Sequence, residues 1–300
     1  MAKERRSLSG KVVAITGGAR GIGKTTAIAL VRKGCRIAIG DLDVELAEQT
    51  AQSLGGGTIA LPLDVTDRES FTSFLDEAER QLGPLDVLIN NAGIMPIGPF
   101  VEEEDATARR MIDINLHGVI FGSKLAMARM IPRNSGHIVN IASQAGKAGF
   151  PGGATYCATK HAVVGLSEAM RAELDGTDIG VSCVMPAVVN TELASGLQEA
   201  RGVKNLEPEE VADAIVDALE TGRFDVWVPR STQYIATVMN VMPRRGREAI
   251  GRFLKADQVL AGADPAARAA YEDRAAHSEP GLEPEAAGEE TVDLPQPADK

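Results

Sequence analysis

The stretch Lys-Val-Val-Ala-Ile-Thr-Gly-Gly-Ala-Arg-Gly-Ile-Gly, residues 11–23, determines the fold that we expect for this chain. Its first six residues form an apolar, strand-like run, and the glycines that follow open a helical pattern. Gly17 permits a tight turn, Gly21 lets the backbone approach a phosphate group, and Gly23 allows the helix to pack closely on the strand. Because a helix N-terminus attracts negative charge, the stretch predicts a turn that holds the pyrophosphate of a dinucleotide.

Short apolar runs alternate with longer helical patterns from this stretch to residue 228. We expect strands at Lys11–Thr16, Arg36–Gly40, Thr58–Leu63, Leu85–Ile89, His137–Ile141, Gly180–Met185 and Phe224–Val228. We expect helices at Lys24–Lys33, Val44–Leu54, Asp67–Leu82, Glu104–Ile131, Ala154–Leu174 and Pro208–Thr221. Strands that are apolar throughout are buried on both faces, which is typical of a parallel sheet covered by helices. The pattern predicts an α/β fold with a doubly wound, seven-stranded parallel sheet of the Rossmann-like kind, followed by a helical extension.

Polar or turn-forming residues follow six of the predicted strands at the point where each strand ends. These residues are Gly17, Asp41, Asp64, Asn91, Ser143 and Pro186. The carboxyl ends of parallel strands meet at one edge of the sheet, which is where such sheets bind their ligands. We therefore expect one binding site to contain all six residues.

Asp41 determines which dinucleotide we expect. It follows the second strand, eighteen residues after Gly23, where a carboxylate accepts hydrogen bonds from both hydroxyls of an adenosine ribose and repels a 2′-phosphate. Arg20 in the glycine turn favours the opposite choice if its guanidinium binds that phosphate, but it can simply face solvent. We give Asp41 the greater weight, so the sequence favours NAD over NADP.

Asp64 follows the third strand and has two interpretations. Its carboxylate accepts a hydrogen bond from the adenine amino group, with the backbone of Val65 beside it, or it is a capping acid before Asp67. The sequence leaves both open. In the next strand-end segment, we expect Asn91 to hold the sheet edge together and Gly93 to let the backbone approach the cofactor.

Tyr156 and Lys160 are the most informative catalytic candidates. They lie four residues apart in a predicted helix, so their side chains share one face. A phenol with an ordinary pKa of about 10 is a poor acid–base catalyst at neutral pH, and we expect the Lys160 ammonium to lower that pKa. Ser143 lies thirteen residues upstream of Tyr156 at a strand end. Together with the glycine turn, this arrangement points to hydride transfer.

In combination, these motifs resemble those of the short-chain dehydrogenase/reductase family over roughly residues 8–230. The motifs are TGGARGIG, NNAG, Asn115 within Asp-Ile-Asn-Leu-His-Gly, Ser143, and YCATK. The resemblance implies that Tyr156 is the general acid in carbonyl reduction and the base in alcohol oxidation. It also implies that Lys160 lowers the tyrosine pKa and holds the nicotinamide ribose, while Ser143 donates a hydrogen bond to the substrate oxygen. Asn115 would hold a water that links Lys160 to solvent, and Thr191 would bind the nicotinamide carboxamide.

The resemblance and the strand ends together predict which residues contact the cofactor. They are Gly17, Arg20, Gly21, Ile22, Gly23, Asp41, Leu42, Asp64, Val65, Asn91, Ala92, Gly93, Tyr156, Lys160, Pro186, Val189 and Thr191. The family often has Pro-Gly after the sixth strand, whereas this chain has Pro186-Ala187. The added methyl group could shift the backbone near the nicotinamide.

The composition is that of a globular protein, with 300 residues, 44% of them hydrophobic, and a formal net charge of −11. The acidic balance argues against a nucleic-acid surface. Six of the eleven net negative charges come from 278–300, which we expect to be a disordered acidic tail. Cys35, Cys157 and Cys183 are isolated, which suits a reducing compartment and indicates no metal site. No apolar run is long enough to span a membrane, so we expect a cytoplasmic protein.

We expect residues 1–230 to form the dinucleotide-binding and catalytic domain, with 231–277 as a helical extension of it. Ser231–Met242 is apolar and helix-like, Arg244–Leu260 is basic and amphipathic, and Pro265–His277 is an Ala-rich helix. Two interpretations of 231–260 remain open. We prefer a cover for the substrate pocket that also builds a subunit interface, and the alternative is a basic helix that lies on a membrane surface.

The loop Glu192–Asn205 is expected to close over the substrate, and it carries Leu193 and Leu197 but few charges. The sequence therefore predicts an NAD-dependent oxidoreductase that interconverts a secondary alcohol and a ketone, with an apolar, steroid- or lipid-like substrate. The alternatives are an NADP-dependent carbonyl reductase and a non-catalytic dinucleotide-binding sensor or scaffold. The resemblance also implies a homotetramer or homodimer built on the helices expected at Glu104–Ile131 and Ala154–Leu174.

Overall fold

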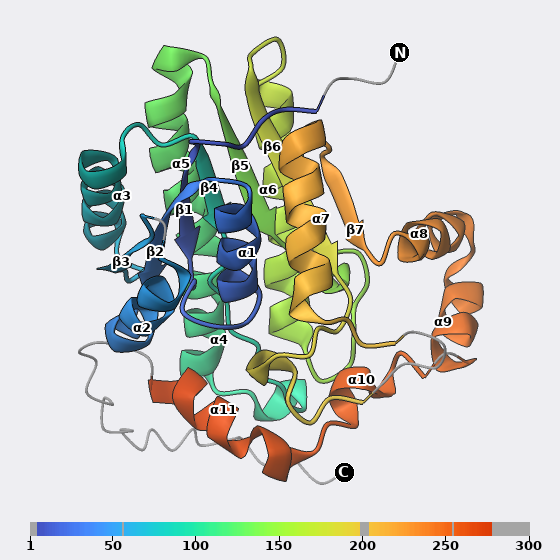
Figure 1. Ribbon diagram of the computed structural model, residues 1–300. Coiled ribbons are helices and arrows are strands. Elements are labelled where there is room, and N and C mark those ends of the chain that lie inside the picture. Colours follow the sequence, from blue (N-terminus) through green and yellow to red (C-terminus); the bar gives the residue numbers. More distant parts are fainter. Residues whose placement is uncertain (1–4, 56, 199–203, 254, 278–300) are drawn as a thin grey trace, which may run out of the picture.

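All seven strands lie in one parallel sheet, in the order β3-β2-β1-β4-β5-β6-β7 (Figure 1). The computed structural model describes residues 5–55, 57–198, 204–253 and 255–277, so the predicted acidic tail lies outside the described residues. Helices cover both faces of the sheet, and the chain reverses its direction of winding between β1 and β4. The predicted α/β class, the seven-stranded parallel sheet and the helical C-terminal region are confirmed.

The strands are β1 (Val12–Thr16), β2 (Arg36–Asp41), β3 (Ile59–Pro62), β4 (Val87–Asn90), β5 (Gly136–Ile141), β6 (Ile179–Pro186) and β7 (Asp225–Val228). The helices between them are α1 (Gly21–Arg32), α2 (Val44–Leu54), α3 (Arg68–Leu82), α4 (Asp105–Ile112), α5 (Gly118–Met130), α6 (Ala154–Glu173) and α7 (Pro208–Thr221). The C-terminal helices are α8 (Ser231–Val241), α9 (Arg244–Phe253), α10 (Gln258–Ala261) and α11 (Pro265–His277).

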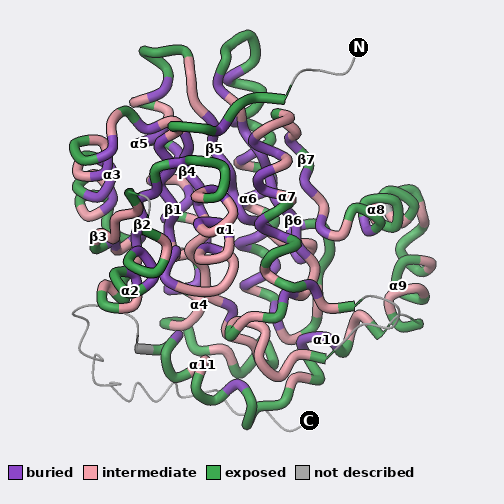
Figure 2. The backbone as a smooth tube through the Cα atoms, viewed as in Figure 1, coloured by how far each residue is buried: buried purple, intermediate pink, exposed green. Residues whose placement is uncertain are grey.

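Successive residues of a strand face opposite sides of the sheet, and this alternation divides the core into two layers. The strands between these layers are mostly buried (Figure 2). In β1, Val12 and Ala14 pack in the layer beneath α3, α5 and α6. Val13 and Ile15 pack in the opposite layer, beneath α1, α2 and α7. All four residues are buried from solvent, which explains why this strand is apolar throughout.

The turn between β1 and α1 needs glycine for two different reasons. Gly17 has φ +63°, and a Cβ there would also lie 2.9 Å from the Cα of Ala92. A Cβ on Gly23 would lie 2.3 Å from the Gly17 carbonyl oxygen, so any side chain would push α1 away from the turn. The first turn of α1 is thereby held against the carboxyl edge of the sheet.

The helical stretch predicted at Glu104–Ile131 is confirmed at 105–130, although it consists of three consecutive pieces rather than one regular α-helix. A π-helical turn at Asp113–His117 separates α4 from α5. This wider turn contains Asn115, which is fully buried and hydrogen-bonded to Ile94. A hydrophobic period identifies the helical stretch, but it does not reveal one extra residue inserted into a single turn.

The helix predicted at Arg244–Leu260 is also interrupted. At the end of α9 the Ala256 N–H donates to the Gly251 carbonyl oxygen (2.9 Å), and Lys255 has φ +55°. A left-handed residue with such a backbone bond is a common helix C-terminus. The chain then turns back, and α10 and α11 cross the lower edge of the molecule in Figure 1. No helix in the described part of the chain is long and apolar enough to cross a membrane.

Candidate active site

One continuous cavity of about 1370 Å³ runs along the carboxyl edge of the sheet, from the glycine turn past Tyr156. The predicted residues that line it are Gly17, Arg20, Gly21, Ile22, Asp41, Leu42, Asp64, Val65, Asn91, Ala92, Gly93, Ser143, Tyr156, Lys160, Pro186, Val189 and Thr191. Gly23 and Asn115 are not part of this lining, because each is packed behind it. The parallel sheet thus brings six strand ends, distant in sequence, into one site.

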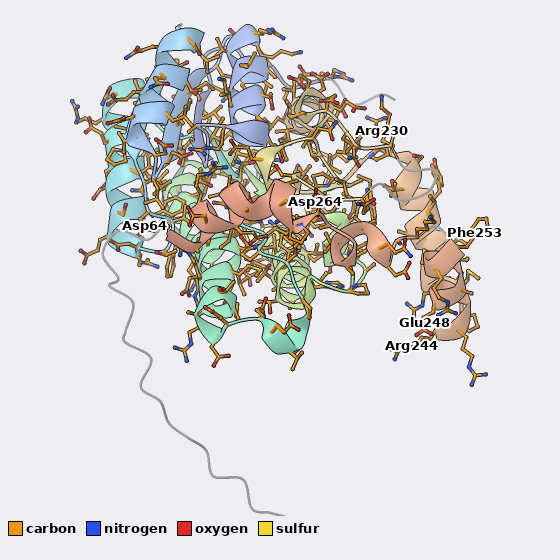
Figure 3. The ribbon with its side chains drawn as sticks, turned by 90° about the horizontal axis from the view of Figure 1, so that it is seen from below. Asp64, Arg230, Arg244, Glu248, Phe253 and Asp264 are labelled. Atoms are coloured by element: carbon orange, nitrogen blue, oxygen red, sulfur yellow. The ribbon has the colours of Figure 1, made fainter. Side chains whose placement is uncertain are left out.

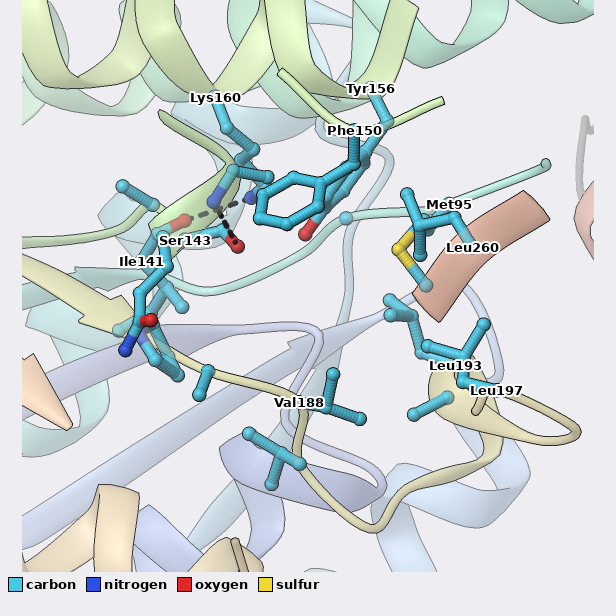
Figure 4. Close-up of a pocket in the computed structure, with 18 of the residues that line it drawn as sticks. Met95, Ile141, Ser143, Phe150, Tyr156, Lys160, Val188, Leu193, Leu197 and Leu260 are labelled. Carbon is cyan, nitrogen blue, oxygen red and sulfur yellow. Dashed lines mark hydrogen bonds between the residues drawn. The ribbon is translucent and has the colours of Figure 1, made fainter. Parts of the chain in front are cut away.

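Tyr156, Ser143 and Lys160 face the same part of this cavity (Figure 4). Tyr156 and Lys160 lie on one face of α6, and Ser143 lies just past β5, where its Oγ accepts a hydrogen bond from the Ala145 N–H (3.1 Å). The Lys160 Nζ lies 5.7 Å from the centre of the Tyr156 ring and donates to the Ile141 carbonyl oxygen (2.9 Å). A phenol, a hydroxyl and an amine are therefore held around one position that a substrate oxygen can reach.

Burial dominates the acid–base properties of this pair. It raises the pKa of Tyr156 to about 12, and the neighbouring Ser143 hydroxyl offsets this only in part. Burial also lowers the pKa of Lys160 to about 8. We expected from the sequence that the ammonium lowers the tyrosine pKa, but in the structure the loss of hydration raises it. The protein by itself therefore keeps the phenol protonated at neutral pH.

Asn115 lies behind the cavity, with its amide fully used. Its Oδ1 accepts a hydrogen bond from the Ile94 N–H (2.8 Å), and its Nδ2 donates to the Ile94 carbonyl oxygen (2.8 Å) and to Thr159 Oγ1 (3.3 Å). A Cβ on Gly93 would come within 3.1 Å of Asn115 Oδ1 and 3.7 Å of Lys160 Nζ. Asn115 thus fixes the backbone that borders the Lys160 amine, while its water-holding role stays a prediction.

The opposite end of the cavity contains Asp41 and Arg20, the two residues that we expect to discriminate between NAD and NADP. Asp41 accepts hydrogen bonds from the backbone N–H groups of Ala19 (3.0 Å) and Asp43 (3.1 Å), which fix its carboxylate in the wall. Burial raises the pKa of Asp41. Arg20 forms ion pairs with Asp43 and, at 3.3 Å, with Glu192. The Arg20 guanidinium therefore already has two carboxylate partners.

Asp64 and its neighbour Asp67 have separate roles. Asp64 Oδ1 accepts hydrogen bonds from the backbone N–H (2.8 Å) and the hydroxyl (2.7 Å) of Thr66, and the residue lines the cavity. Asp67 accepts a hydrogen bond from the Glu69 N–H (2.8 Å) and begins α3 as its cap. Asp64 therefore does not cap this helix, and its contact with adenine stays a prediction.

Beyond Tyr156 the cavity is apolar (Figure 4). Tyr156, Met95, Val259 and Leu260 belong to one hydrophobic cluster, and the partly buried residues packed against it include Phe150, Leu193 and Leu197. Leu193 and Leu197 come from the loop that we expected to close over the substrate. Val259 and Leu260 come from α10, at the end of the segment 231–260 that we preferred as a cover for the substrate pocket. The sequence did not single out these two residues within that segment, because their apolar spacing indicates only a buried helix face.

Helix α11 is held across this apolar end by Arg268, whose side chain is only 3% exposed. The guanidinium donates to the backbone carbonyl oxygens of Met95 (2.8 Å), Leu193 (3.1 Å) and Ser195 (3.0 Å) and pairs with Glu272 (2.8 Å). One side chain therefore ties α11 to the loop after β4 and to the loop after β6. Nothing in the Ala-rich sequence of α11 distinguishes this buried arginine from a solvated one.

Tyr271, also on α11, adds a further contact that the sequence did not predict. Its hydroxyl accepts a hydrogen bond from the Met95 N–H (2.7 Å), and its ring lies below the Arg268 guanidinium, 5.0 Å from it. Burial raises the pKa of Tyr271. No cluster of His, Cys, Asp or Glu that could hold a metal ion occurs among the residues that the structure describes.

Comparison with known proteins identifies the family of this chain. The family model described as short chain dehydrogenase matches residues 11–202. The chain belongs to the short-chain dehydrogenase/reductase family. Residues 11–202 of this family member contain the glycine turn and the Tyr156, Ser143 and Lys160 cluster, whereas α7 to α11 follow the matched region.

Individual relatives of this short-chain dehydrogenase/reductase extend the comparison. Rat 17-beta-hydroxysteroid dehydrogenase 13 is 31% identical over 257 residues, which cover 84% of this chain and 85% of that protein. Sorbitol dehydrogenase of Cereibacter sphaeroides is 39% identical over 191 residues, which cover 63% of this chain and 75% of that protein. A crystal structure of a short-chain dehydrogenase/reductase from Burkholderia phymatum, in complex with NAD, has a TM-score of 0.73 at 26% identity and covers 78% of this chain and 94% of that one. The family is one of oxidoreductases, and this chain is an oxidoreductase by descent.

Proposed function

We propose that this short-chain dehydrogenase/reductase uses NAD to interconvert a secondary alcohol and a ketone on an apolar substrate. The observation that carries the proposal is the cluster of Tyr156, Ser143 and Lys160 in the same cavity as Asp41. A proton donor for a carbonyl oxygen and a carboxylate suited to ribose hydroxyls then lie in one continuous site. The relative from Burkholderia was solved in complex with NAD, which supports the choice of cofactor.

The wall near the glycine turn fits a dinucleotide. Gly21 has φ +52°, and a Cβ at this position would lie 3.4 Å from the Thr191 side chain. Because glycine has no side chain, space remains between α1 and the loop after β6. Arg20 precedes α1 without a capping side-chain bond, so the first N–H groups of the helix are available to a phosphate. We expect Tyr156 and Lys160 to hold the nicotinamide ribose and Thr191 to hold the carboxamide.

In ketone reduction, the Tyr156 hydroxyl donates its proton to the substrate carbonyl oxygen, and Ser143 donates a hydrogen bond to the same oxygen. Bound nicotinamide supplies the hydride to the carbonyl carbon in this direction and accepts it in alcohol oxidation. The phenol that gives up its proton becomes a buried phenolate, and the neighbouring Lys160 ammonium stabilises it. In oxidation the phenolate takes the alcohol proton, so the oxidation rate is expected to rise with pH.

The choice of NAD over NADP rests on Asp41 and Arg20. The Asp41 carboxylate is held in place by two backbone N–H groups, so a 2′-phosphate beside it would meet a fixed negative charge. The Arg20 guanidinium already pairs with Asp43 and Glu192. A 2′-phosphate would have to displace these two carboxylates before Arg20 could bind it.

The apolar end of the cavity supports the substrate class. Met95, Leu197 and Leu260 line it. Two buried arginines lie nearby: Arg268 donates to backbone carbonyl oxygens, and Arg110, which lines the cavity, donates to the Ala276 carbonyl oxygen. Two relatives carry names that point to different substrates: one is named a hydroxysteroid dehydrogenase and the other a sorbitol dehydrogenase. A hydroxysteroid is apolar, whereas sorbitol is highly polar. The side chains of this cavity favour the apolar alternative.

A panel of secondary alcohols of increasing apolar size, each with NAD and with NADP, tests the proposal. We expect the enzyme to oxidise these alcohols with NAD, and kcat/KM to rise with the apolar size of the alcohol. For each alcohol, kcat/KM should be lower with NADP than with NAD. Dinucleotide binding without turnover across the panel would favour the sensor or scaffold, and a preference for NADP would favour the carbonyl reductase. The homotetramer or homodimer and the cytoplasmic location stay predictions, and light scattering of the purified protein tests the first of them.

A further inference from the structure

The inner face of α8 borders the substrate cavity. Thr232, Ile235, Ala236 and Met239 line its wall, and their spacing of three, one and three residues places them on one side of the helix. A helix that covers a cavity in this way normally presents polar side chains on its other side. The outer face of α8 is therefore informative.

That outer face is apolar as well. Tyr234, Val238 and Val241 follow one another at helical spacing, and their exposed fractions are 77%, 57% and 83%. The segment 231–243 contains no Asp, Glu, Lys or Arg. A helix that is apolar on opposite sides requires an apolar environment, and a contiguous exposed patch of this kind marks an interaction site. Figure 2 shows α8 as largely exposed, projecting from the body of the molecule.

The neighbouring helix α9 is strongly basic. The segment 231–257 has a net charge of +3, whereas the whole chain has −11. Its charged residues are Arg244, Arg245, Arg247, Arg252 and Lys255, with Glu248 and Asp257. Figure 3 shows α9 standing away from the sheet together with α8, with Arg244, Glu248 and Phe253 on it. An apolar stripe beside a basic helix on an acidic protein selects an apolar, negatively charged partner.

We propose that the hairpin formed by α8 and α9 docks on a bilayer surface that carries anionic lipids. Tyr234, Val238 and Val241 would enter the boundary between headgroups and acyl chains. Arg245 and Lys255, which are exposed and lie outside the cavity lining, would contact the anionic headgroups, whereas Arg244, Arg247 and Arg252 border the cavity. A second copy of this chain is a poorer occupant, because a two-fold contact would bring two clusters of positive charge together.

Docking in this way brings the substrate cavity to the lipid surface, because the inner face of the same helix lines that cavity. An apolar alcohol or ketone dissolved in the bilayer then reaches Tyr156 past Ile235 and Met239. This delivery of substrate rests on the proposed function. Binding of the protein to lipid does not, so vesicle binding with no turnover would refute only the proposed function.

Co-sedimentation of the full chain with vesicles tests the docking. We expect binding to vesicles that mix phosphatidylcholine with phosphatidylglycerol, weakened by added salt, and little binding to phosphatidylcholine alone. The double variant Val238→Glu with Val241→Glu should bind the mixed vesicles at least about 25-fold more weakly. Each added negative charge near the anionic surface should lower the affinity about fivefold, which corresponds to about 1 kcal/mol. Its matched control is Val101→Glu, at an exposed valine (91%) outside the hairpin, which should bind as the wild type does.

A second pair of variants tests the basic side chains separately. Arg245→Gln with Lys255→Gln should also weaken binding by about 25-fold, whereas Arg32→Gln with Lys124→Gln, at exposed basic positions outside the hairpin, should not. Thermal unfolding checks that each variant is folded. The proposal is overturned if the wild type binds neither vesicle, or if hairpin and control variants bind alike. A dimer that Val238→Glu with Val241→Glu dissociates, without vesicle binding, would assign the patch to a second copy instead.

Discussion

Replacing Arg268 with leucine should release α11 from the apolar end of the cavity. The buried guanidinium donates to three backbone carbonyl oxygens, and each such bond from a charged donor contributes about 1.5–3 kcal/mol. The loss would be about 5–9 kcal/mol if α11 stayed in place with these acceptors unpaired. Moving α11 away lets water reach the carbonyl oxygens, so we expect the helix to undock and the sheet to remain folded.

Hydrogen exchange measured by mass spectrometry reports this directly. In Arg268→Leu, amide exchange in α11 should accelerate by at least about 100-fold, which corresponds to about 2.8 kcal/mol of lost protection, while exchange in the strands stays as in the wild type. Steady-state kinetics with an apolar alcohol should show a larger rise in KM than fall in kcat. The reason is that Arg268 positions the wall of the pocket and does not touch the reacting atoms.

Arg274→Gln is the matched control, because Arg274 lies on the same helix and pairs with Glu192 (2.8 Å) at the surface. The two side chains are 47% and 55% exposed, so the pair contributes at most about 1 kcal/mol and the exchange of α11 should change by less than about fivefold. Unchanged exchange of α11 in Arg268→Leu, or equal effects of the two variants, would refute the assignment of Arg268 as the residue that holds this helix.

Three further predictions concern the cavity itself. Ser143→Ala should lower kcat by about 10²- to 10³-fold while NAD affinity stays within a few fold, as measured by steady-state kinetics and titration calorimetry; an unchanged kcat would contradict its role at the substrate oxygen. Asp41→Ser should weaken NAD binding and strengthen NADP binding, and an unchanged ratio of the two dissociation constants would remove Asp41 from the nucleotide choice. Burial lowers the pKa of Lys160 from 10.5 to about 8 in the folded state. Between these two pH values the unfolded chain binds more protons than the folded chain, so the destabilisation caused by burying Lys160 decreases as pH rises. The unfolding free energy of Lys160→Met relative to the wild type should therefore fall by about 2 kcal/mol between pH 7 and pH 9.5 in chemical denaturation, and a difference independent of pH would contradict the lowered pKa.

The parts of the fold that follow from sequence are those in which local pattern and burial agree. Strand β1 is apolar throughout because both of its faces are buried, and Gly17 occurs where the backbone takes a positive φ. The strand-end polar residues were predictable as a group for the same reason, since parallel strands end at one edge. The π turn around Asn115 was not predictable, because one inserted residue leaves the hydrophobic period almost unchanged.

The parts of the site that escaped prediction depend on contacts between distant segments. Arg268 is a site residue only because α11 folds back beneath the loops after β4 and β6, and no local pattern encodes that return. Leu260 lies in the segment 231–260 that we preferred as a pocket cover, but no local pattern indicates that it packs in one cluster with Tyr156. The pKa of Tyr156 follows from its burial, whereas the spacing to Lys160 revealed only the neighbouring charge.

The most direct test of the proposed chemistry is the turnover of Tyr156→Phe with NAD and the best alcohol from the substrate panel. The variant keeps the aromatic ring and loses only the hydroxyl that would move the proton. We predict that kcat falls by about 10²- to 10⁴-fold while the dissociation constant for NAD changes by no more than a few fold. Hydride transfer close to the wild-type rate in Tyr156→Phe would contradict the assignment of Tyr156 as the catalytic acid and base.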